Sequence, residues 1–147
     1  MQVLLGKFAG TVNKQNRLTL PPQFRAELAG GAYITQGFDR NLQVLSASAF
    51  KEIYQRVISL NIADPLARLL LRMILGTAQE LDADERDALQ IPDELREFAG
   101  LKQEALLVGQ GDYFEIWAPE FWASQEAELR DAETNARRFA VLTVATR

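Results

Sequence analysis

The 147-residue sequence contains no cysteine and no histidine. Without cysteine the chain cannot form disulfide bonds or use a thiol nucleophile. Without histidine it lacks the usual zinc ligand and the side chain that most often serves as a general base. The sequence also lacks a glycine-rich phosphate loop and the nucleophile elbow of hydrolases. We therefore expect a protein that is not an enzyme, with no catalytic residues, cofactor or small-molecule substrate.

Long hydrophobic segments are also missing. No apolar run approaches the roughly 20 residues that span a membrane, and the N-terminus lacks the basic flank and apolar core of a signal peptide. These features predict a cytoplasmic protein without membrane contact. One acidic cluster could suggest calcium, but it lacks the glycine and the closing glutamate of a calcium loop. The cluster consists of Asp82, Asp84, Glu85 and Asp87. We expect no bound metal.

The main positive feature of the sequence is an internal repeat. The sequence of residues 11–25 is similar to that of residues 82–96, and Pro21 matches Pro92 at an offset of 92 − 21 = 71 residues. Phe24 and Leu95 keep the apolar pattern at the same offset, and the similarity continues downstream with one extra residue. A repeat of this kind indicates supersecondary units that need a partner to bury their apolar faces. Because each half is too small to bury much core alone, we expect the halves to interlock and the chain to form oligomers.

The two copies differ in charge. The chain carries a net charge of −4, yet residues 1–25 contain four basic residues and no acidic one. Residues 80–97 contain eight acidic residues and two arginines, which gives that segment a charge of −6. Because local charge decides which surface can approach an anionic partner, only the first copy suits one.

Hydrophobic periodicity and turn residues predict a mixed α+β chain. Short strands are expected at residues 8–12, 17–20, 33–35, 42–45, 105–108 and 113–117. Short helices should follow the prolines at 21–22 and at 92. Between the copies, two apolar stripes predict helices, one across residues 50–58 and one from Pro65 to a stop near Gly76. A further helix should begin near Pro119, and the apolar tail at residues 137–147 is expected to dock on this or another subunit.

The order of turn, arginine, strand and proline, repeated around a helical insert, resembles the MraZ family of bacterial DNA-binding regulators. The residues that carry this resemblance include 12–21, 24–25, 37–39, 95–101 and 108–117. The resemblance implies two tandem AbrB/MazE-like swapped-hairpin repeats, each a small β-barrel unit, joined and flanked by helices. The boundaries predicted are 4–52 and 77–124 for the repeats, 53–76 for the helical insert, and 125–147 for the C-terminal helix and tail. It also implies ring-shaped homo-oligomers and repression of a cell-division and cell-wall gene cluster through repeated operator boxes.

The DNA-contacting motif of that family is Asp-x-x-x-Arg, usually with glycine just before the arginine. In the first copy Arg17 is present, while Asn13 replaces the aspartate and Asn16 the glycine. In the second copy Asp84 is present, but Asp87 replaces the glycine and Ala88 the arginine. The resemblance therefore implies DNA contacts through the first copy, with the site residues Asn13, Lys14, Gln15, Asn16 and Arg17.

Two interpretations of this motif remain open at the level of sequence. A guanidinium can bond O6 and N7 of guanine together, so Arg17 suits the reading of bases in double-stranded DNA. Considered alone, however, an arginine in a turn is more often simply solvent-exposed. The second interpretation is an oligomeric scaffold that has lost DNA binding and acts through protein–protein contacts. The departures from the motif in both copies favour this alternative, and the acid-free first copy favours DNA binding.

Overall fold

The computed structural model describes residues 3–81 and 88–142. The first part of the chain contains β1 (Lys7–Thr11), β2 (Arg17–Thr19), α1 (Pro22–Glu27), β3 (Ala32–Gln36), β4 (Leu42–Ser46), α2 (Ala47–Ile58) and α3 (Pro65–Ile74). The second part contains β5 (Gln79–Leu81), β6 (Ala88–Gln90), α4 (Asp93–Phe98), β7 (Glu104–Gly109), β8 (Tyr113–Trp117), α5 (Pro119–Arg130) and α6 (Ala132–Phe139). The predicted α+β class and the predicted helices of the insert are confirmed.

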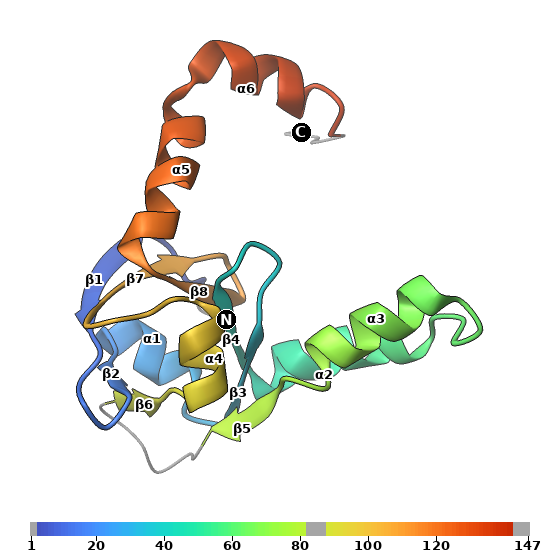
Figure 1. Cartoon of the computed structure of the whole chain (residues 1–147), viewed down its shortest axis with the longest axis horizontal. Coiled ribbons are helices and arrows are strands. Elements are labelled where there is room, and N and C mark those ends of the chain that lie inside the picture. The colour runs from blue at the N-terminus through green and yellow to red at the C-terminus, as the bar shows by residue number, and fades with distance from the viewer. Residues whose placement is uncertain (1–2, 82–87, 143–147) are drawn as a thin grey trace.

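Strands from both copies are interleaved within one antiparallel sheet. Its order is β1-β7-β8-β4-β3-β5, and β2 pairs with β6 in a separate two-stranded ribbon (Figure 1). Strands β1 to β4 come from the first copy and β5 to β8 from the second. Each copy therefore completes its hydrogen bonding with strands of the other, and the expected interlocking of the halves is confirmed. The exact boundaries predicted for the repeats stay a prediction.

The strand register shows that the copies are related by an approximate two-fold axis. In the β2–β6 ribbon Leu18 faces Leu89, its own counterpart at the repeat offset. In the β4–β8 pair Gln43 faces Glu115, its counterpart at the downstream offset. An antiparallel pair in which residues face their own counterparts has a local two-fold axis between them. The β1–β7 and β3–β5 pairs are then equivalent to one another.

The main apolar core lies between the sheet, the ribbon and the short helices α1 and α4. Phe24 from α1 packs on Phe114 from β8 with ring centroids 4.7 Å apart, and Phe8 meets Phe24 edge-on at 5.3 Å. Ile91 of the second copy is completely buried in the same cluster. Because the core side chains come from both copies, neither copy can bury its apolar residues without the other.

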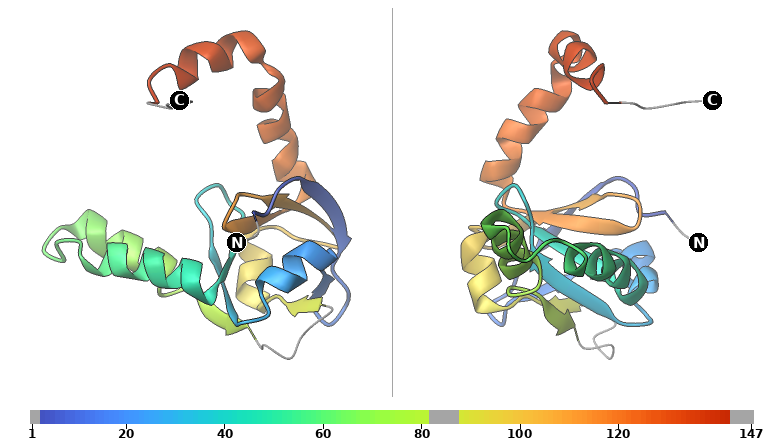
Figure 2. Two further views of the ribbon diagram at one scale, coloured as in Figure 1. Left: turned by 180° about the vertical axis from the view of Figure 1, so that it is seen from behind. Right: turned by 90° about the vertical axis from the view of Figure 1, so that its right-hand side faces the viewer.

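Helices α2 and α3 form a hairpin that projects from the barrel-like body (Figures 1 and 2). Ser46 caps α2 by accepting the Ala49 amide at 3.2 Å, and Asp64 caps α3 by accepting the Leu66 amide at 2.9 Å. Both helices lie where the apolar stripes predicted them. Packing between them leaves part of each stripe uncovered, since Ile58 of α2 is 49% exposed and Leu66 of α3 is 71% exposed.

The C-terminal helices form a second projection. Helix α5 leaves the body near β7, and α6 turns away at its far end (Figure 2). The first turn of α5 is anchored by Trp122, whose ring lies edge-on to Trp117 at 5.4 Å. The apolar residues that end the described chain, Phe139, Val141 and Leu142, are exposed. The predicted docking of the tail is therefore absent within a single chain as far as residue 142. No helix in the described residues is long and apolar enough to cross a membrane.

Candidate functional site

The turn between β1 and β2, residues 13–16, is closed by its own backbone and one side chain; we call it the first-repeat turn. The Asn13 side-chain oxygen accepts the backbone amides of Gln15 at 2.9 Å and Arg17 at 3.0 Å. The Asn16 amide donates to the Asn13 carbonyl at 3.0 Å, and the Asn13 amide donates to the Arg17 carbonyl at 3.0 Å. Asn16 has a φ of 63°, a left-handed conformation that asparagine tolerates better than most residues. Asparagine can therefore replace both aspartate and glycine in shaping this turn.

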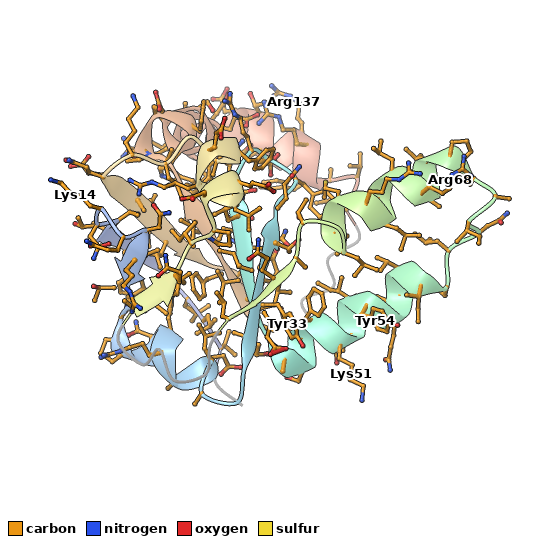
Figure 3. The ribbon with its side chains drawn as sticks, turned by 60° about the horizontal axis from the view of Figure 1, so that its bottom comes forward. Lys14, Tyr33, Lys51, Tyr54, Arg68 and Arg137 are labelled. Atoms are coloured by element: carbon orange, nitrogen blue, oxygen red, sulfur yellow. The ribbon has the colours of Figure 1, made fainter. Side chains whose placement is uncertain are left out.

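The turn presents its remaining side chains to solvent. Lys14, Gln15 and Arg17 are exposed, whereas Leu18, next in β2, is fully buried. Strand alternation then places Arg17 and Thr19 on the outer face of the ribbon. Lys14 extends from the edge of the molecule opposite the α2–α3 hairpin (Figure 3). The five residues singled out in the sequence thus lie together in one exposed turn at one end of the β2–β6 ribbon.

Residues of the second copy hold this turn. The Gln90 side chain donates to the Gln15 carbonyl at 2.6 Å, and the Ile91 amide donates to the Asn16 carbonyl at 2.8 Å. The Asn16 side-chain amide donates to the Asp93 carboxylate, and the Arg96 guanidinium donates to the Asn16 side-chain oxygen. Sequence reasoning did not identify these supporting residues. The only signal was the repeat itself, which places Arg96 at the position equivalent to Arg25.

The position in the second copy that is equivalent to Arg17 carries no charged side chain. Ala88 is half-buried in β6 and faces Thr19, so a methyl group stands where the first copy has the Arg17 guanidinium. The rest of the second motif, including Asp84 and Asp87, lies outside the described residues, as does the acidic cluster considered for calcium. The described part of the second copy therefore provides no cation at the motif position.

The charge around the first-repeat turn is mixed rather than uniformly positive. Asp93 and Glu94, both exposed, occupy the first turn of α4 beside Asn16. Lys7 is exposed on β1, where its ammonium lies 5.7 Å from the centre of the Trp122 ring. The exposed cations of the motif are Lys14 and Arg17, which are three positions apart in the sequence.

Comparison with known families gives two consecutive matches. The model for "MraZ protein, putative antitoxin-like" matches residues 3–73 and again residues 74–142. These two stretches contain, respectively, strands β1 to β4 and strands β5 to β8. The chain belongs to the MraZ family.

Similar proteins match over almost their whole length. A "Transcriptional regulator MraZ" of Thermomicrobium roseum is 39% identical, and the alignment covers 95% of this chain and 99% of that protein. Proteins of the same name from Roseiflexus sp. and Herpetosiphon aurantiacus are 36% and 35% identical. The alignments cover 94% and 82% of this chain and 94% and 84% of the relatives, respectively. The family model thus matches the same two halves that the strand register relates by a two-fold axis.

Proposed function

We propose that this chain is a DNA-binding transcriptional regulator that contacts its operator through the first-repeat turn. The observation that carries the proposal is the exposed pair Lys14 and Arg17 on a turn that hydrogen bonds hold from its own backbone, from the Asn13 side chain and from the second copy, in a chain whose relatives are named transcriptional regulators. A turn that is already ordered before binding loses less conformational entropy on contact with DNA. The first-repeat turn is therefore suited to entering a groove of double-stranded DNA.

We assign different roles to the five motif residues, based on their hydrogen bonds and exposure. The Asn13 side-chain oxygen accepts two backbone amides, and the Asn16 side chain is bonded to Asp93 and Arg96. In the proposed complex these two asparagines shape the turn. Lys14 contacts phosphate, and Arg17 reads guanine through O6 and N7 in the major groove. Gln15 is exposed beside them, and a side-chain amide can bond adenine at N6 and N7.

The proposed regulator acts as a closed ring of identical chains. Each turn brings few cations, so several turns must bind together to give useful affinity. The α2–α3 hairpin supplies an apolar surface for assembly, a groove of about 700 Å³ that is lined mainly by apolar residues. Its lining includes Phe38, Leu60, Leu66, Leu69 and Met73. The hairpin and the first-repeat turn lie on opposite sides of the body, so assembly through one leaves the other accessible (Figure 3).

The proposed target and location rest on the resemblance to the family. We propose repression of a cell-division and cell-wall gene cluster through repeated operator boxes, in the cytoplasm at the nucleoid. The proposed activity is binding and not catalysis, and it requires no cofactor, metal ion or small-molecule substrate. Repeated boxes suit a ring, because adjacent chains can bind adjacent boxes without new contacts between protein and DNA.

A second candidate function is an oligomeric scaffold that binds protein partners instead of DNA. Ala88 at the second motif position and the acidic start of α4 beside the turn favour this candidate. Exposed apolar residues on the hairpin and the C-terminal helices would provide its contacts. The two candidates differ in a simple way, because only the regulator distinguishes its operator from other DNA.

The test is a binding titration of the intact protein against DNA from upstream of its own gene and against a scrambled duplex. The regulator should bind the upstream DNA more tightly. Its affinity should also fall as salt rises, because each phosphate that a lysine or arginine neutralises releases counterions. The slope of log affinity against log salt should correspond to few phosphate contacts per chain. Equal binding to both duplexes, or no binding at low salt, would favour the scaffold.

A further inference from the structure

Arg96 lies on α4 in the second copy. Its guanidinium donates hydrogen bonds both to the loop that follows α4 and to the first-repeat turn. Its Nε donates to the Leu101 carbonyl at 3.1 Å, and its Nη2 donates to the Lys102 carbonyl at 2.5 Å. Its Nη1 donates to the Asn16 side-chain oxygen at 2.5 Å and to the Asn13 carbonyl at 3.3 Å. All three nitrogens of the half-buried guanidinium thus have acceptors on two segments.

The two contacts from Nη1 connect the ends of the first-repeat turn. Asn13 begins the turn, and Asn16 ends it in the left-handed conformation immediately before Arg17. The side-chain amide nitrogen of Asn16 donates to the carboxylate of Asp93, which lies three residues before Arg96 on α4. A single side chain, Asn16, is therefore held between an acid and a base of the same short helix.

We propose that Arg96 is a positioning residue for DNA recognition, which fixes the first-repeat turn so that Arg17 is presented in one orientation. The proposal rests on the proposed function. In this account the second copy takes part in recognition without touching DNA. The chain then carries two unlike copies of one unit, one that makes the contact and one that holds it.

The guanidinium is suited to this task because its donors are arranged in a rigid plane. A lysine ammonium at the same place would keep the charge but could not reach acceptors on both segments with fixed geometry. A turn without this support samples more conformations, and only some of them can bind DNA. The apparent affinity then falls in proportion to the fraction of molecules in the binding-competent conformation. The cost of ordering one or two freed side chains corresponds to a loss of roughly three- to tenfold in specific affinity.

A purely structural role for Arg96 makes a different prediction. The bonds to the Leu101 and Lys102 carbonyls could simply stabilise the loop after α4. Loss of the side chain would then lower the free energy of unfolding and leave the preference for operator over scrambled DNA unchanged. The ratio of the two affinities in protein that remains folded is therefore the decisive readout.

The experiment compares Arg96→Lys and Arg96→Ala with Arg130→Ala in the intact protein. Arg130 is exposed at the C-terminal end of α5 and pairs with Glu126 one turn earlier on the same helix. Arg130→Ala therefore removes the same charge as Arg96→Ala but at a site outside the first-repeat turn. Upstream and scrambled duplexes are titrated with each variant, and hydrogen exchange of the Gln15 and Asn16 amides is measured without DNA. Arg96→Lys keeps the charge, so the proposal can still be tested with this variant if Arg96→Ala fails to fold.

We expect both Arg96 variants to lose about three- to tenfold in operator affinity, with little change on scrambled DNA. Exchange at the two turn amides should become faster. Arg130→Ala should retain the wild-type preference for operator. Wild-type preference in a folded Arg96→Lys protein would overturn the proposal and leave the proposed function intact. If the wild-type protein itself does not prefer its operator, the proposed function fails, and the positioning role falls with it.

Discussion

Leu18 and Leu89 face each other across the β2–β6 ribbon, and each is the counterpart of the other in the repeat. Both are buried in the core that the two copies share, with exposures of 0% and 3%. The same relationship recurs between Gln43 and Glu115 in the main sheet. The chain is therefore a covalently linked pair of units that share one main core.

This relationship predicts one cooperative unfolding transition for the whole body. Leu18→Ala and Leu89→Ala should each lower the free energy of unfolding by about 2–5 kcal/mol, the usual cost of a leucine-sized cavity. Because Leu18 and Leu89 are paired across the ribbon, their substitutions should be coupled. The loss of unfolding free energy in the double variant should therefore differ from the sum of the two single losses. Both tryptophans, Trp117 and Trp122, lie in the second copy, so denaturant unfolding is followed by their fluorescence and by circular dichroism of the whole chain. Two separate transitions, or a change confined to one copy, would contradict a shared core.

Local signals in the sequence predicted most of the elements. Pro65 after Asp64 indicated the start of α3, and the spacing of apolar residues indicated the faces of α2 and α3. The repeat predicted that the halves interlock. It could not predict that β1 would pair with β7 or that β5 would pair with β3, because register between distant strands depends on packing across the whole core.

The candidate site was predicted less completely than the fold. The turn and its exposed Lys14 and Arg17 followed from the motif. The bonds from Gln90, Asp93 and Arg96 join residues about 75 to 83 positions apart, and no periodic pattern encodes such contacts. The local sequence around a polar residue does not determine which distant group its side chain will bond.

Assembly through the α2–α3 hairpin predicts a change in particle mass. Leu69→Glu places a charge in the apolar groove and should convert the oligomer to smaller species, because a buried unpaired carboxylate is costly. Gln55→Glu adds the same charge on the exposed part of α2 outside the groove lining and serves as the control. Light scattering at micromolar concentration measures the mass. An unchanged mass for Leu69→Glu would exclude this groove as the subunit interface.

The pKa of Glu115 predicts a dependence of stability on pH. Burial raises the pKa of its carboxyl group, Asp39 adds to the increase, and a hydrogen bond from the Trp117 indole at 2.9 Å opposes it. Because the folded state binds this proton more tightly, Glu115 favours folding below its unfolded pKa of about 4.3. That contribution is lost as the pH rises through the higher pKa of the folded state.

Glu115→Gln should therefore be more stable than the wild type at neutral pH, and the difference should shrink below about pH 4. The reciprocal Gln43→Glu places a second carboxylate directly opposite Glu115 and should be less stable at neutral pH. Unfolding free energies of the three proteins between about pH 3 and 8 test both expectations. A stability difference between Glu115→Gln and wild type that is independent of pH would contradict them.

The central claim is that Arg17 reads bases from a turn formed by the first copy. Arg17→Ala removes the only guanidinium at a described motif position and should cost about 1–3 kcal/mol per engaged site. Arg17→Lys keeps the charge but loses the two-pronged geometry, so it separates base reading from attraction to phosphate. Asp84→Ala, in the second copy, should leave binding unchanged or slightly stronger because it removes a negative charge.

The most direct measurement is therefore a parallel titration of wild type, Arg17→Lys, Arg17→Ala and Asp84→Ala against operator and scrambled DNA, with the oligomer mass of each checked. The account predicts that Arg17→Lys keeps the affinity for scrambled DNA and loses most of the preference for operator. It predicts that Arg17→Ala loses both the preference and part of the salt dependence. If Arg17→Ala binds operator as tightly and as selectively as the wild type, Arg17 does not contact DNA and the regulator account is contradicted.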